Sequence, residues 1–339
     1  MKELFVLLLL NFIFINLNAF AAPKFSARYD LSANDSAPSS IIFNDDGTRM
    51  YMSNRANPTV WEYSLTTGYD LTDVNALRTL STVGEEPLPE GITFNNNGSK
   101  LYSIGSGTGT VWEYDLTTNY DLNTALVNQA LPVNHANPSD IKFNNDGSKM
   151  YTVDAVAQQI EEFDLSIAYD VQSAGGSTRT YDLSSQVTTA EGVEFNSDGT
   201  KMFIVDGTLN TVFSYTLSTG FLVTSATYSE SFDLSGKIQE ATSITFNNDG
   251  TMMFIADGTS DDVESYTMCA YSLTETPGSC SSESEESEET GESGSLPDPT
   301  NDSKVVGSID AQSQSAKNFI KYSTNSVSNR LSSIRQNKS

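Results

Sequence analysis

The feature that most constrains this chain is a unit of roughly fifty residues that occurs five times. Each copy carries the pattern Phe-Asn-x-Asp-Gly or Phe-Asn-x-Asn-Gly, and the five glycines are 51, 49, 52 and 51 residues apart. A fixed period of this length is typical of solenoids and propellers, in which each unit buries its apolar face against the next. The five motifs, with the residue before the Phe, begin at Ile42, Thr93, Lys142, Glu194 and Thr245.

Each copy contains three apolar runs of strand length that are rich in β-branched and aromatic residues. The Asp-Gly or Asn-Gly pair between the first two runs suits a tight hairpin, because these residues tolerate positive φ. Asp206-Gly207 and Asp257-Gly258 supply similar pairs between the second and third runs. A fourth strand is predicted from the segments 29–32, 77–81, 126–130, 181–184 and 232–235.

A repeated four-stranded antiparallel meander is the blade of a propeller, so we expect an all-β, five-bladed β-propeller over residues 22–270. The strand at 29–32 precedes the first complete set of three, whereas the last set, which ends at Met268, has no strand after it. Pairing the N-terminal strand with the last blade would close the ring and remove exposed sheet edges. The predicted ring therefore has five blades closed by the N-terminal strand.

The repeats resemble those of secreted bacterial and phage-borne β-propeller proteins of the NHL-like and WD40-like kind. The similarity lies in Phe-Asn-x-Asp-Gly-x-Lys-Met-Tyr, followed by Val-x-Glu-Tyr-x-Leu-Thr-x-x-Tyr-Asp-Leu, and it covers residues 25–270. This resemblance implies the propeller fold. It leaves the activity open, because propellers serve both as enzymes and as binding modules.

The chain is strongly acidic, with 18 basic and 44 acidic residues among 339 and a formal charge of −26. An acidic protein repels phosphate backbones, so we exclude nucleic acid as a partner. One histidine and two cysteines are too few for most zinc or copper sites and for most imidazole-dependent catalysis. We interpret His135 as a loop residue rather than a base. Trp61 and Trp112 share one repeat position, and we expect them in the core rather than on a sugar-binding surface.

Residues 1–21 contain a basic residue, an apolar stretch from Leu4 to Ile15 and small residues at Ala19 and Ala21. These are the three parts of a secretory signal peptide, and we expect cleavage after Ala21. The alternative is an uncleaved membrane anchor. In both cases we expect an exported protein, either extracellular or on the outer-membrane surface, with the periplasm as a further option.

Two cysteines, Cys269 and Cys280, follow the last predicted strand. In an oxidising compartment such a pair predicts a disulfide that ties the end of the propeller to the chain beyond it. Residues 271–302 are expected to form an acidic linker rich in Ser and Glu. Its segment 281–295 has no aliphatic or aromatic residue, so it cannot build a core, and we expect it to be disordered.

Residues 303–339 predict an amphipathic helix with one narrow apolar stripe, which includes Val306, Ile320, Val327 and Ile334. The segment resembles the linker that joins the passenger to the membrane barrel in marine bacterial autotransporters. This resemblance implies an outer-membrane barrel as the partner of residues 303–336. A coiled-coil partner is the alternative.

The strongest enzyme alternative is a calcium-dependent lactonase of the gluconolactonase kind, whose propeller holds a metal in its channel with a Glu at the start of an inner strand. Glu90-Gly91 and Glu191-Gly192 resemble that pattern, and the resemblance implies calcium ligation by Glu90, Glu191 and Asp140. The other interpretation is repeat variation at a solvated rim, because other copies carry Ser or Thr there. Further carboxylates at nearby repeat positions are Asp154, Asp206 and Asp257.

These observations favour a secreted or surface-displayed, noncatalytic propeller that binds a surface glycan, a polymer or a protein. We expect no cofactor, calcium excepted. The alternatives are the calcium-dependent lactonase-like hydrolase, with its metal in the propeller channel, and a structural component of a spike or tail fibre.

Overall fold

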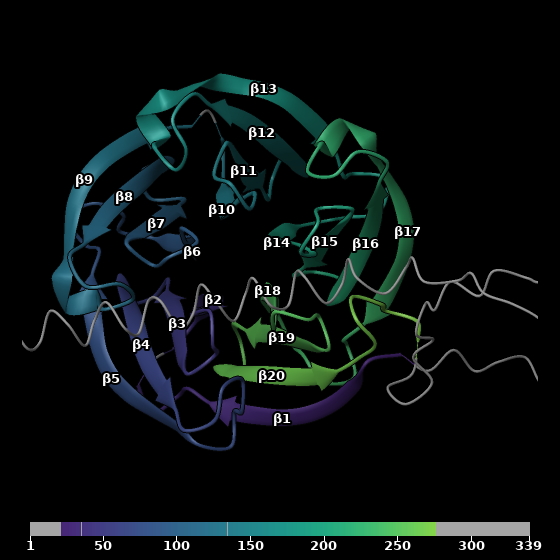
Figure 1. The fold of residues 1–339 in the computed structure, drawn as a ribbon. Helices are drawn as coiled ribbons and strands as arrows, with labels where there is room; N and C mark the ends of the chain where they lie inside the picture. Colours follow the sequence, from purple (N-terminus) through teal and green to yellow (C-terminus); the bar gives the residue numbers. More distant parts are fainter. Residues whose placement is uncertain (1–21, 35, 134, 276–339) are drawn as a thin grey trace, which may run out of the picture. The chain divides into compact units, whose positions relative to one another are not determined.

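The computed structural model describes residues 22–34, 36–133 and 135–275, which belong to one structural unit. Across these residues the chain forms twenty strands and three short 3-10 helices. The strands make five sheets of four, and Figure 1 shows the sheets arranged as blades around a common centre. Neighbouring strands in each sheet are antiparallel, so the predicted five-bladed β-propeller is confirmed.

Each blade runs from an inner strand to an outer strand. Blade 1 contains β2 (Pro38–Phe43), β3 (Arg49–Asn54), β4 (Thr59–Leu65) and β5 (Val74–Ser81). Blade 2 contains β6 (Pro89–Phe94), β7 (Lys100–Gly105), β8 (Thr110–Leu116) and β9 (Ala125–Pro132). Blade 3 contains β10 (Pro138–Phe143), β11 (Lys149–Asp154), β12 (Gln159–Leu165) and β13 (Ala174–Asp182).

Blade 4 contains β14 (Ala190–Phe195), β15 (Lys201–Asp206), β16 (Thr211–Leu217) and β17 (Ala226–Asp233). Blade 5 contains β18 (Ala241–Phe246), β19 (Met252–Asp257), β20 (Asp262–Thr267) and, as its outer strand, β1 (Lys24–Asp30). The three 3-10 helices lie just before outer strands and are η1 (Leu122–Thr124), η2 (Val171–Ser173) and η3 (Val223–Ser225).

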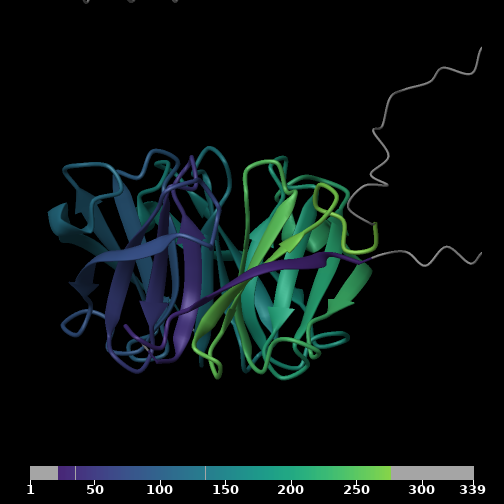
Figure 2. The ribbon, with the colours of Figure 1, turned by 90° about the horizontal axis from the view of Figure 1, so that it is seen from below.

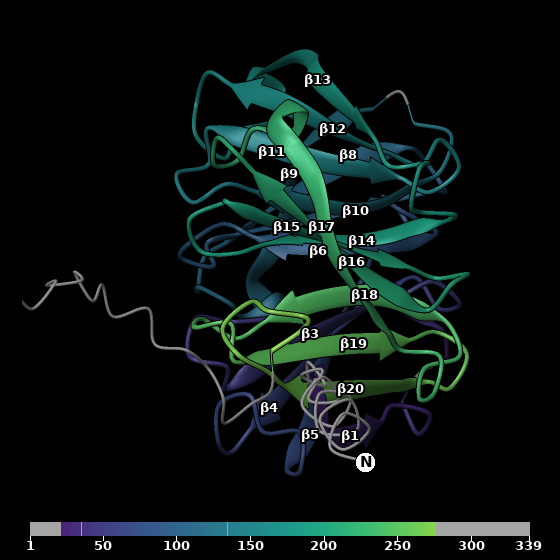
Figure 3. The same cartoon turned by 90° about the vertical axis from the view of Figure 1, so that its right-hand side faces the viewer.

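Strand β1 closes the ring. It pairs antiparallel with β20, from Lys24 opposite Thr267 to Asp30 opposite Asp262. Figure 2 shows the purple β1 crossing the green strands of the last blade, and Figure 3 shows β1 beside β20. The predicted closure is confirmed, and it leaves β20 without a free edge.

The outer strands begin earlier than the sequence pattern predicted. β13 starts at Ala174 and β17 at Ala226, and each ends at the Asp of a Tyr-Asp-Leu-Ser or Phe-Asp-Leu-Ser segment. After β13, Oδ1 of Asp182 accepts the N–H of Ser184 at 2.8 Å, and Leu183 is buried. The Asp-Leu-Ser motif therefore ends the strand with a side-chain-capped turn, because Asp readily accepts from the backbone two residues ahead.

The apolar core lies between the blades. One cluster joins Tyr151 and Ile160 of blade 3 to Val193 and Ile204 of blade 4. Four further clusters join the other neighbouring pairs of blades. Each blade is therefore covered on both faces, which explains the nearly continuous apolar runs in the middle strands.

The glycine of each Phe-Asn-x-Asp-Gly motif is required by both its backbone and its neighbour. Gly47 has φ +70°, and a Cβ at this position would lie 2.3 Å from the ring of Tyr69. The same contact recurs in every blade, so an aromatic ring covers each hairpin turn. Glycine is the residue that combines this φ with such a close approach. The glycine–aromatic pairs are Gly47–Tyr69, Gly98–Tyr120, Gly147–Tyr169, Gly199–Phe221 and Gly250–Tyr271.

The second set of Asp-Gly pairs does not supply positive φ, so that expectation was wrong. In these turns the positive φ falls later, on Asn210 (48°) and Asp261 (55°). Gly207 is needed for space instead, because a Cβ there would lie 2.8 Å from Cγ of Glu191. Asp206 caps its turn by accepting backbone N–H groups of Thr188, Thr189, Thr208 and Leu209.

Three buried glutamates bridge neighbouring blades, and the sequence pattern did not predict their role. They occupy the same position in the third strand of blades 1 to 3 and are fully buried. Each carboxylate accepts a backbone N–H at the start of a 3-10 helix in the next blade. The pairs are Glu62 with Leu122 at 3.2 Å, Glu113 with Val171 at 3.4 Å and Glu162 with Val223 at 3.0 Å.

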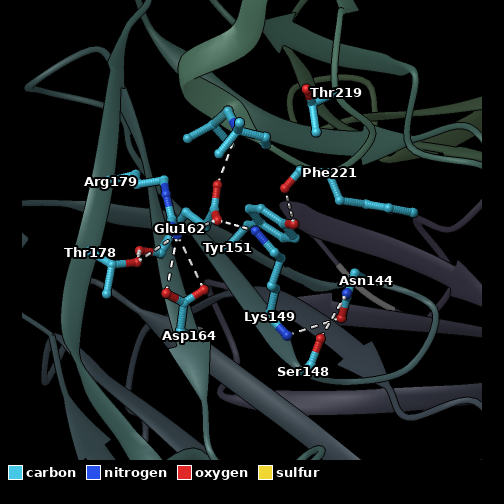
Figure 4. Close-up of polar contacts among 12 residues, drawn as sticks. Asn144, Ser148, Lys149, Tyr151, Glu162, Asp164, Thr178, Arg179, Thr219 and Phe221 are labelled. Atoms are coloured by element: carbon cyan, nitrogen blue, oxygen red, sulfur yellow. Dashed lines mark hydrogen bonds and ion pairs between the residues drawn. The ribbon is translucent and has the colours of Figure 1, made fainter.

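Basic residues compensate these buried charges within the same blade. Lys149 and Arg179 both contact Oε1 of Glu162, Arg179 at 2.7 Å (Figure 4). Arg179 on β13 also forms an ion pair, at 3.1 Å, with Asp164, which lies on β12 with Glu162. The hydroxyl of Tyr151 adds a second bridge to the next blade by donating to the carbonyl of Phe221 at 2.6 Å.

Several sequence predictions fall outside the described residues. These are the signal segment 1–21, Cys280, most of the linker and the helix over 303–339. Cys269 is buried after β20, and its pairing with Cys280 remains a prediction. Tyr271 and Leu273, which were expected to begin the linker, pack in the last blade. The described part of the chain contains no helix long and apolar enough to cross a membrane.

We predict that Glu162→Gln destabilises the propeller by about 1–3 kcal/mol, because a neutral amide replaces the charged acceptor of Lys149, Arg179 and the Val223 N–H. Asp164→Asn is the matched control, since this carboxylate pairs with the same Arg179 but is 49% exposed against 0% for Glu162. Its cost should stay below about 1 kcal/mol. Urea unfolding of both variants measures the difference, and equal costs would contradict the bridging role.

We also predict that deleting residues 25–35 causes aggregation, because β20 then presents an unpaired edge. Deleting residues 296–339 should leave a soluble propeller and serves as the control. Light scattering and thermal unfolding distinguish the two proteins. A soluble, cooperatively melting N-terminal deletion would show that β1 is not needed to close the ring.

Candidate functional site

The central channel has two ends, which differ in the loops that surround them. We call the end with the first hairpins of the blades, residues 44–47, 95–98, 144–147, 196–199 and 247–250, the turn face. The opposite end, where the inner strands begin, is the loop face. Figure 1 shows the inner strands β2, β6, β10, β14 and β18 around the centre.

Glu90 and Glu191 lie at the loop face, at the irregularity in the first hairpin of blades 2 and 4. The Nε of Arg55 is 3.5 Å from Oε2 of Glu90, and its Nη2 is 3.8 Å from Oε1 of Glu240. Glu191 also interacts electrostatically with Arg55. The structure thus brings two of the three predicted calcium ligands, Glu90 and Glu191, to one channel mouth. Both interact there with the guanidinium group of Arg55.

Burial raises the pKa of Glu90 and of Glu191 to about 7 each. The positive charge of Arg55 lowers both pKa values and so opposes the effect of burial. The negative charge of Glu191 further raises the pKa of Glu90, and that of Glu240 further raises the pKa of Glu191. Carboxyl groups that titrate near neutral pH at a channel mouth are suited to proton transfer.

Asp140, the third predicted ligand, has a structural task inside the wall of the channel. Its Oδ2 accepts the N–H of Val193 in blade 4 at 2.9 Å, and its Oδ1 accepts the N–H of Ile141 at 2.8 Å. Burial raises its pKa to about 6, while Lys142 and these two N–H groups act against the rise. Gly91 is needed beside it, because a Cβ there would lie 2.5 Å from Cα of Asp140.

The three predicted ligands do not fit a calcium site. Both oxygens of Asp140 already bind backbone N–H groups, and the positive charge of Arg55 lies beside Glu90. Within the described ranges no three His, Cys, Asp or Glu side chains are placed to hold a metal ion. Calcium binding remains a prediction, and we derive no chemistry through it.

The other carboxylates at nearby repeat positions cap turns. Asp257 accepts the N–H groups of Gln239, Glu240, Thr259 and Ser260, as Asp206 does in blade 4. Asp154 accepts from Ala136, Val156 and Ala157. These side chains hold hairpins and blade connections together.

His135 lies on a loop, as expected, but it forms a contact that the sequence did not suggest. Its Nε2 is 2.6 Å from Oγ1 of Thr152, and its Nδ1 is 3.4 Å from Oδ2 of Asp154. A hydroxyl, an imidazole and a carboxylate in this order match the arrangement of an activated nucleophile. The imidazole side chain is fully buried, however, as are Thr152 and Asp154. No substrate can reach this hydroxyl in the described conformation.

Trp61 and Trp112 are half-buried and pack against the clusters between blades, in line with the expected core role. The Trp61 ring stacks on Tyr63 with centroids 6.0 Å apart. The indole N–H of Trp112 donates to Oγ1 of Thr108 at 3.3 Å.

The turn face holds a cavity. Its volume is about 290 Å³, and a second hollow of about 230 Å³ shares Glu194 and Asn248 with it. Each inner strand lines the main cavity with the residue just before the repeat Phe, and in four blades the Phe itself also lines it. The five residues before the Phe, which we call the channel ring, are Ile42, Thr93, Lys142, Glu194 and Thr245.

Lys142 and Glu194 form an ion pair in the channel ring. The ammonium of Lys142 is 3.2 Å from Oε2 of Glu194, and Thr245 donates to the same oxygen at 3.3 Å. Burial alone would lower the pKa of Lys142, but Glu194 and Asp140 raise it above its usual value. Lys142 is therefore a buried, charged group inside a cavity.

Polar side chains on the hairpin turns surround the cavity. Asn248 donates to the carbonyl of Asp45 at 2.6 Å, and Tyr120 donates to Oδ1 of Asp45 at 2.6 Å. Asn145 donates to the carbonyl of Ser197 at 2.5 Å. These bonds run from blade to blade, so the rim is rigid as well as polar.

The channel ring was visible in the sequence but was not recognised there. The motif keeps Phe and Asn in all five copies, whereas the residue before the Phe is Ile, Thr, Lys, Glu or Thr. A position that changes in chemical class directly before a constant Phe-Asn pair is the signal that could have identified Lys142 and Glu194.

We predict that the stability of the propeller depends on pH through Glu90 and Glu191. Their folded pKa of about 7 exceeds the usual 4.5, so the folded chain holds these protons more tightly than the unfolded chain. Their stabilising contribution is complete below about pH 4.5 and is lost as the pH rises through 7. The free energy of unfolding should therefore fall by on the order of 3 kcal/mol per group across this range.

The double variant Glu90→Gln and Glu191→Gln should show a flatter dependence, because glutamine does not titrate. Denaturant unfolding at a series of pH values compares the two proteins. Parallel curves would show that neither carboxyl titrates with a raised pKa.

No protein-family model matches this sequence, and neither does any curated protein. Among solved structures, the Cps50 (Swd1) β-propeller domain of Myceliophteria thermophila is 7% identical, with a TM-score of 0.42 over 73% of this chain and 99% of that one. A functionally unknown protein from Desulfotomaculum acetoxidans is 15% identical, with a TM-score of 0.44 over 69% and 70%. A chain of a mitotic checkpoint complex is 11% identical, with a TM-score of 0.41 over 65% and 61%. Similarities at this level assign neither a family nor a function.

Proposed function

We propose that this chain is an exported, noncatalytic binding module and that the turn-face cavity is its binding site. Export is supported by the composition of residues 1–21, which matches a secretory signal. The observation that carries the binding role is the channel ring, where five equivalent positions of one cavity hold four different residue types.

The contrast between constant and varied positions supports this assignment. In the inner strands, the residue before the channel ring is Ile or Val and packs between blades. The residue after it is always Phe, which packs between blades and in four of them also lines the cavity. A position with only a structural task would be expected to hold similar residues in similar blades. The channel ring instead combines an aliphatic residue, two hydroxyls, an ammonium and a carboxylate, as expected for a surface shaped for a ligand.

The charged pair of the cavity suits hydrogen bonding better than proton transfer. A general base works best when its pKa lies near the working pH, and the pKa of Lys142 is raised further from neutrality. Lys142 therefore acts as a permanent donor. The ligand would be a surface glycan, a polymer or a protein segment, held without being turned over.

The basic C-terminal segment, residues 303–336, is proposed as the attachment site of this module. An outer-membrane barrel or a coiled-coil partner would bind it, and the acidic linker would keep the propeller at a distance.

We predict that the full chain without residues 1–21 binds defined ligands on a mixed array of glycans and proteins and leaves them chemically unchanged. Glu90→Gln with Glu191→Gln should leave this binding intact, because these residues lie at the opposite mouth of the channel. Fluorescence on the array measures binding, and mass spectrometry of the recovered ligands measures turnover. The absence of any ligand on the array, or cleavage of the bound one, would contradict the proposal.

A second candidate is the calcium-dependent hydrolase, which is favoured by the meeting of Glu90 and Glu191 at one channel mouth and disfavoured by the contacts of Asp140 and Arg55. It predicts lactone or ester hydrolysis that requires added calcium and disappears in the double glutamine variant. Assays with and without a calcium chelator would detect it, and such activity would replace the binding proposal.

A further inference from the structure

We infer that the turn-face cavity binds a neutral, hydroxyl-rich ligand, the end of a saccharide chain, through Lys142 and Glu194. This inference rests on the proposed binding function and adds the chemical class of the ligand.

The charges of the cavity disfavour an ionic ligand of either sign. Lys142 repels a cation, whereas Glu194 and Asp45 repel an anion, and all three line the same cavity. Lys142 and Glu194 are only 3.2 Å apart, so a charged group that reaches one of them is within range of the other. A neutral ligand that both donates and accepts hydrogen bonds avoids this conflict.

The two side chains have hydrogen-bonding capacity to spare. An ammonium has three N–H donors, and within the described chain Glu194 accounts for one of those of Lys142. Oε1 of Glu194 accepts from the N–H of Phe195 at 3.0 Å, and Oε2 accepts from Thr245 and Lys142. Each carboxylate oxygen has two acceptor sites, so Oε1 retains one for a ligand.

A pair of adjacent hydroxyl groups matches this arrangement. A hydroxyl both donates and accepts, so one can accept from Lys142 while its neighbour donates to Glu194. Hydrogen bonds to charged groups are stronger than those between neutral groups. Lys142 and Glu194 together are therefore suited to bind two adjacent hydroxyl groups. The ring hydroxyls Thr93 and Thr245 add further neutral contacts on the same wall.

Stability does not explain why the ion pair is there. Lys142 is 5% exposed, and the desolvation of a buried pair offsets much of its attraction. Blades 1, 2 and 5 fill the same ring position with Ile or Thr, so the fold accepts uncharged residues there. Lys142 also faces the buried carboxyl of Asp140, which keeps its two backbone N–H donors when Lys142 is replaced. The pairing of Lys142 with Glu194 is therefore better explained by a ligand.

The size of the cavity fits the end of a glycan rather than a folded partner. Pockets for drug-sized ligands have volumes of about 300–1,000 Å³, and the main cavity of about 290 Å³ lies at the lower limit. The adjoining hollow of about 230 Å³ shares Glu194 and gives room for a second, neighbouring unit. One or two sugar rings would fill this space.

The test uses the full chain without residues 1–21 and four neutral probes, the methyl glycosides of glucose, galactose, mannose and N-acetylglucosamine. Glucuronic acid and glucosamine serve as the anionic and cationic counterparts, and N-acetylglutamine amide represents a peptide side chain. Titration calorimetry and saturation-transfer NMR measure binding. At least one neutral glycoside should bind more tightly than both charged sugars and the amide.

The double variant Lys142→Thr and Glu194→Thr should weaken that binding by at least about tenfold, because it removes hydrogen bonds to two charged groups. It places threonine where blades 2 and 5 already have it, and thermal unfolding checks that it remains folded. Asp164→Asn, a change of an exposed carboxylate far along the blade from the channel, is the control and should bind as the wild type does.

Three outcomes would overturn the inference. They are tighter binding of a charged sugar or the amide, no binding of any neutral glycoside, and unchanged binding by the folded threonine variant. If the array finds a peptide or charged ligand that is not turned over, the binding function stands and the saccharide assignment fails. If the array finds no ligand of any class, the binding function itself fails.

Discussion

The constraint on which the rest of this structure depends is that five similar blades must meet at the same angle and close a ring. Apolar packing between sheets is not directional, so it cannot set that angle alone. The buried carboxylates of Glu62, Glu113 and Glu162 can, because each binds one defined N–H of the next blade. In blade 4 the corresponding residue is Ser214. There the contact to the next blade comes from Glu230 on the outer strand, which accepts the N–H of Leu273 at 3.1 Å.

The sequence predicts most of the architecture because the determinants are local and repeat five times. The positive φ of Gly47 and the pairing of β1 with β20 both follow from the motif and its offset along the chain. The task of Asp206 could not be predicted in this way, because an Asp-Gly pair that caps a turn looks the same as one that forms it. The burial of Glu162 depends on the neighbouring blade, and a single repeat does not reveal which side chains face that neighbour.

The candidate site shows the same division between local and long-range information. Glu90 and Glu191 were predicted as site residues from their sequence context, and they do meet at one channel mouth. Arg55, which interacts with both, lies on a hairpin of another blade and is not part of their sequence motif. Lys142 and Glu194 are 52 residues apart in sequence and become a pair only because their blades are neighbours. Repeat proteins place their ligand-binding residues on a scaffold in this way, with constant positions for folding and varied positions for recognition.

Native-state hydrogen exchange tests most directly whether the blade-to-blade bridges make the ring one rigid unit. If they do, the amides of Leu122, Val171 and Val223 should exchange only through global unfolding, with the same free energy as the amides that join β1 to β20. Such a result would support a preorganised channel whose ring residues keep their positions before a ligand arrives. Exchange of one blade at a free energy several kcal/mol below the others would contradict the account, because the blades would then open independently.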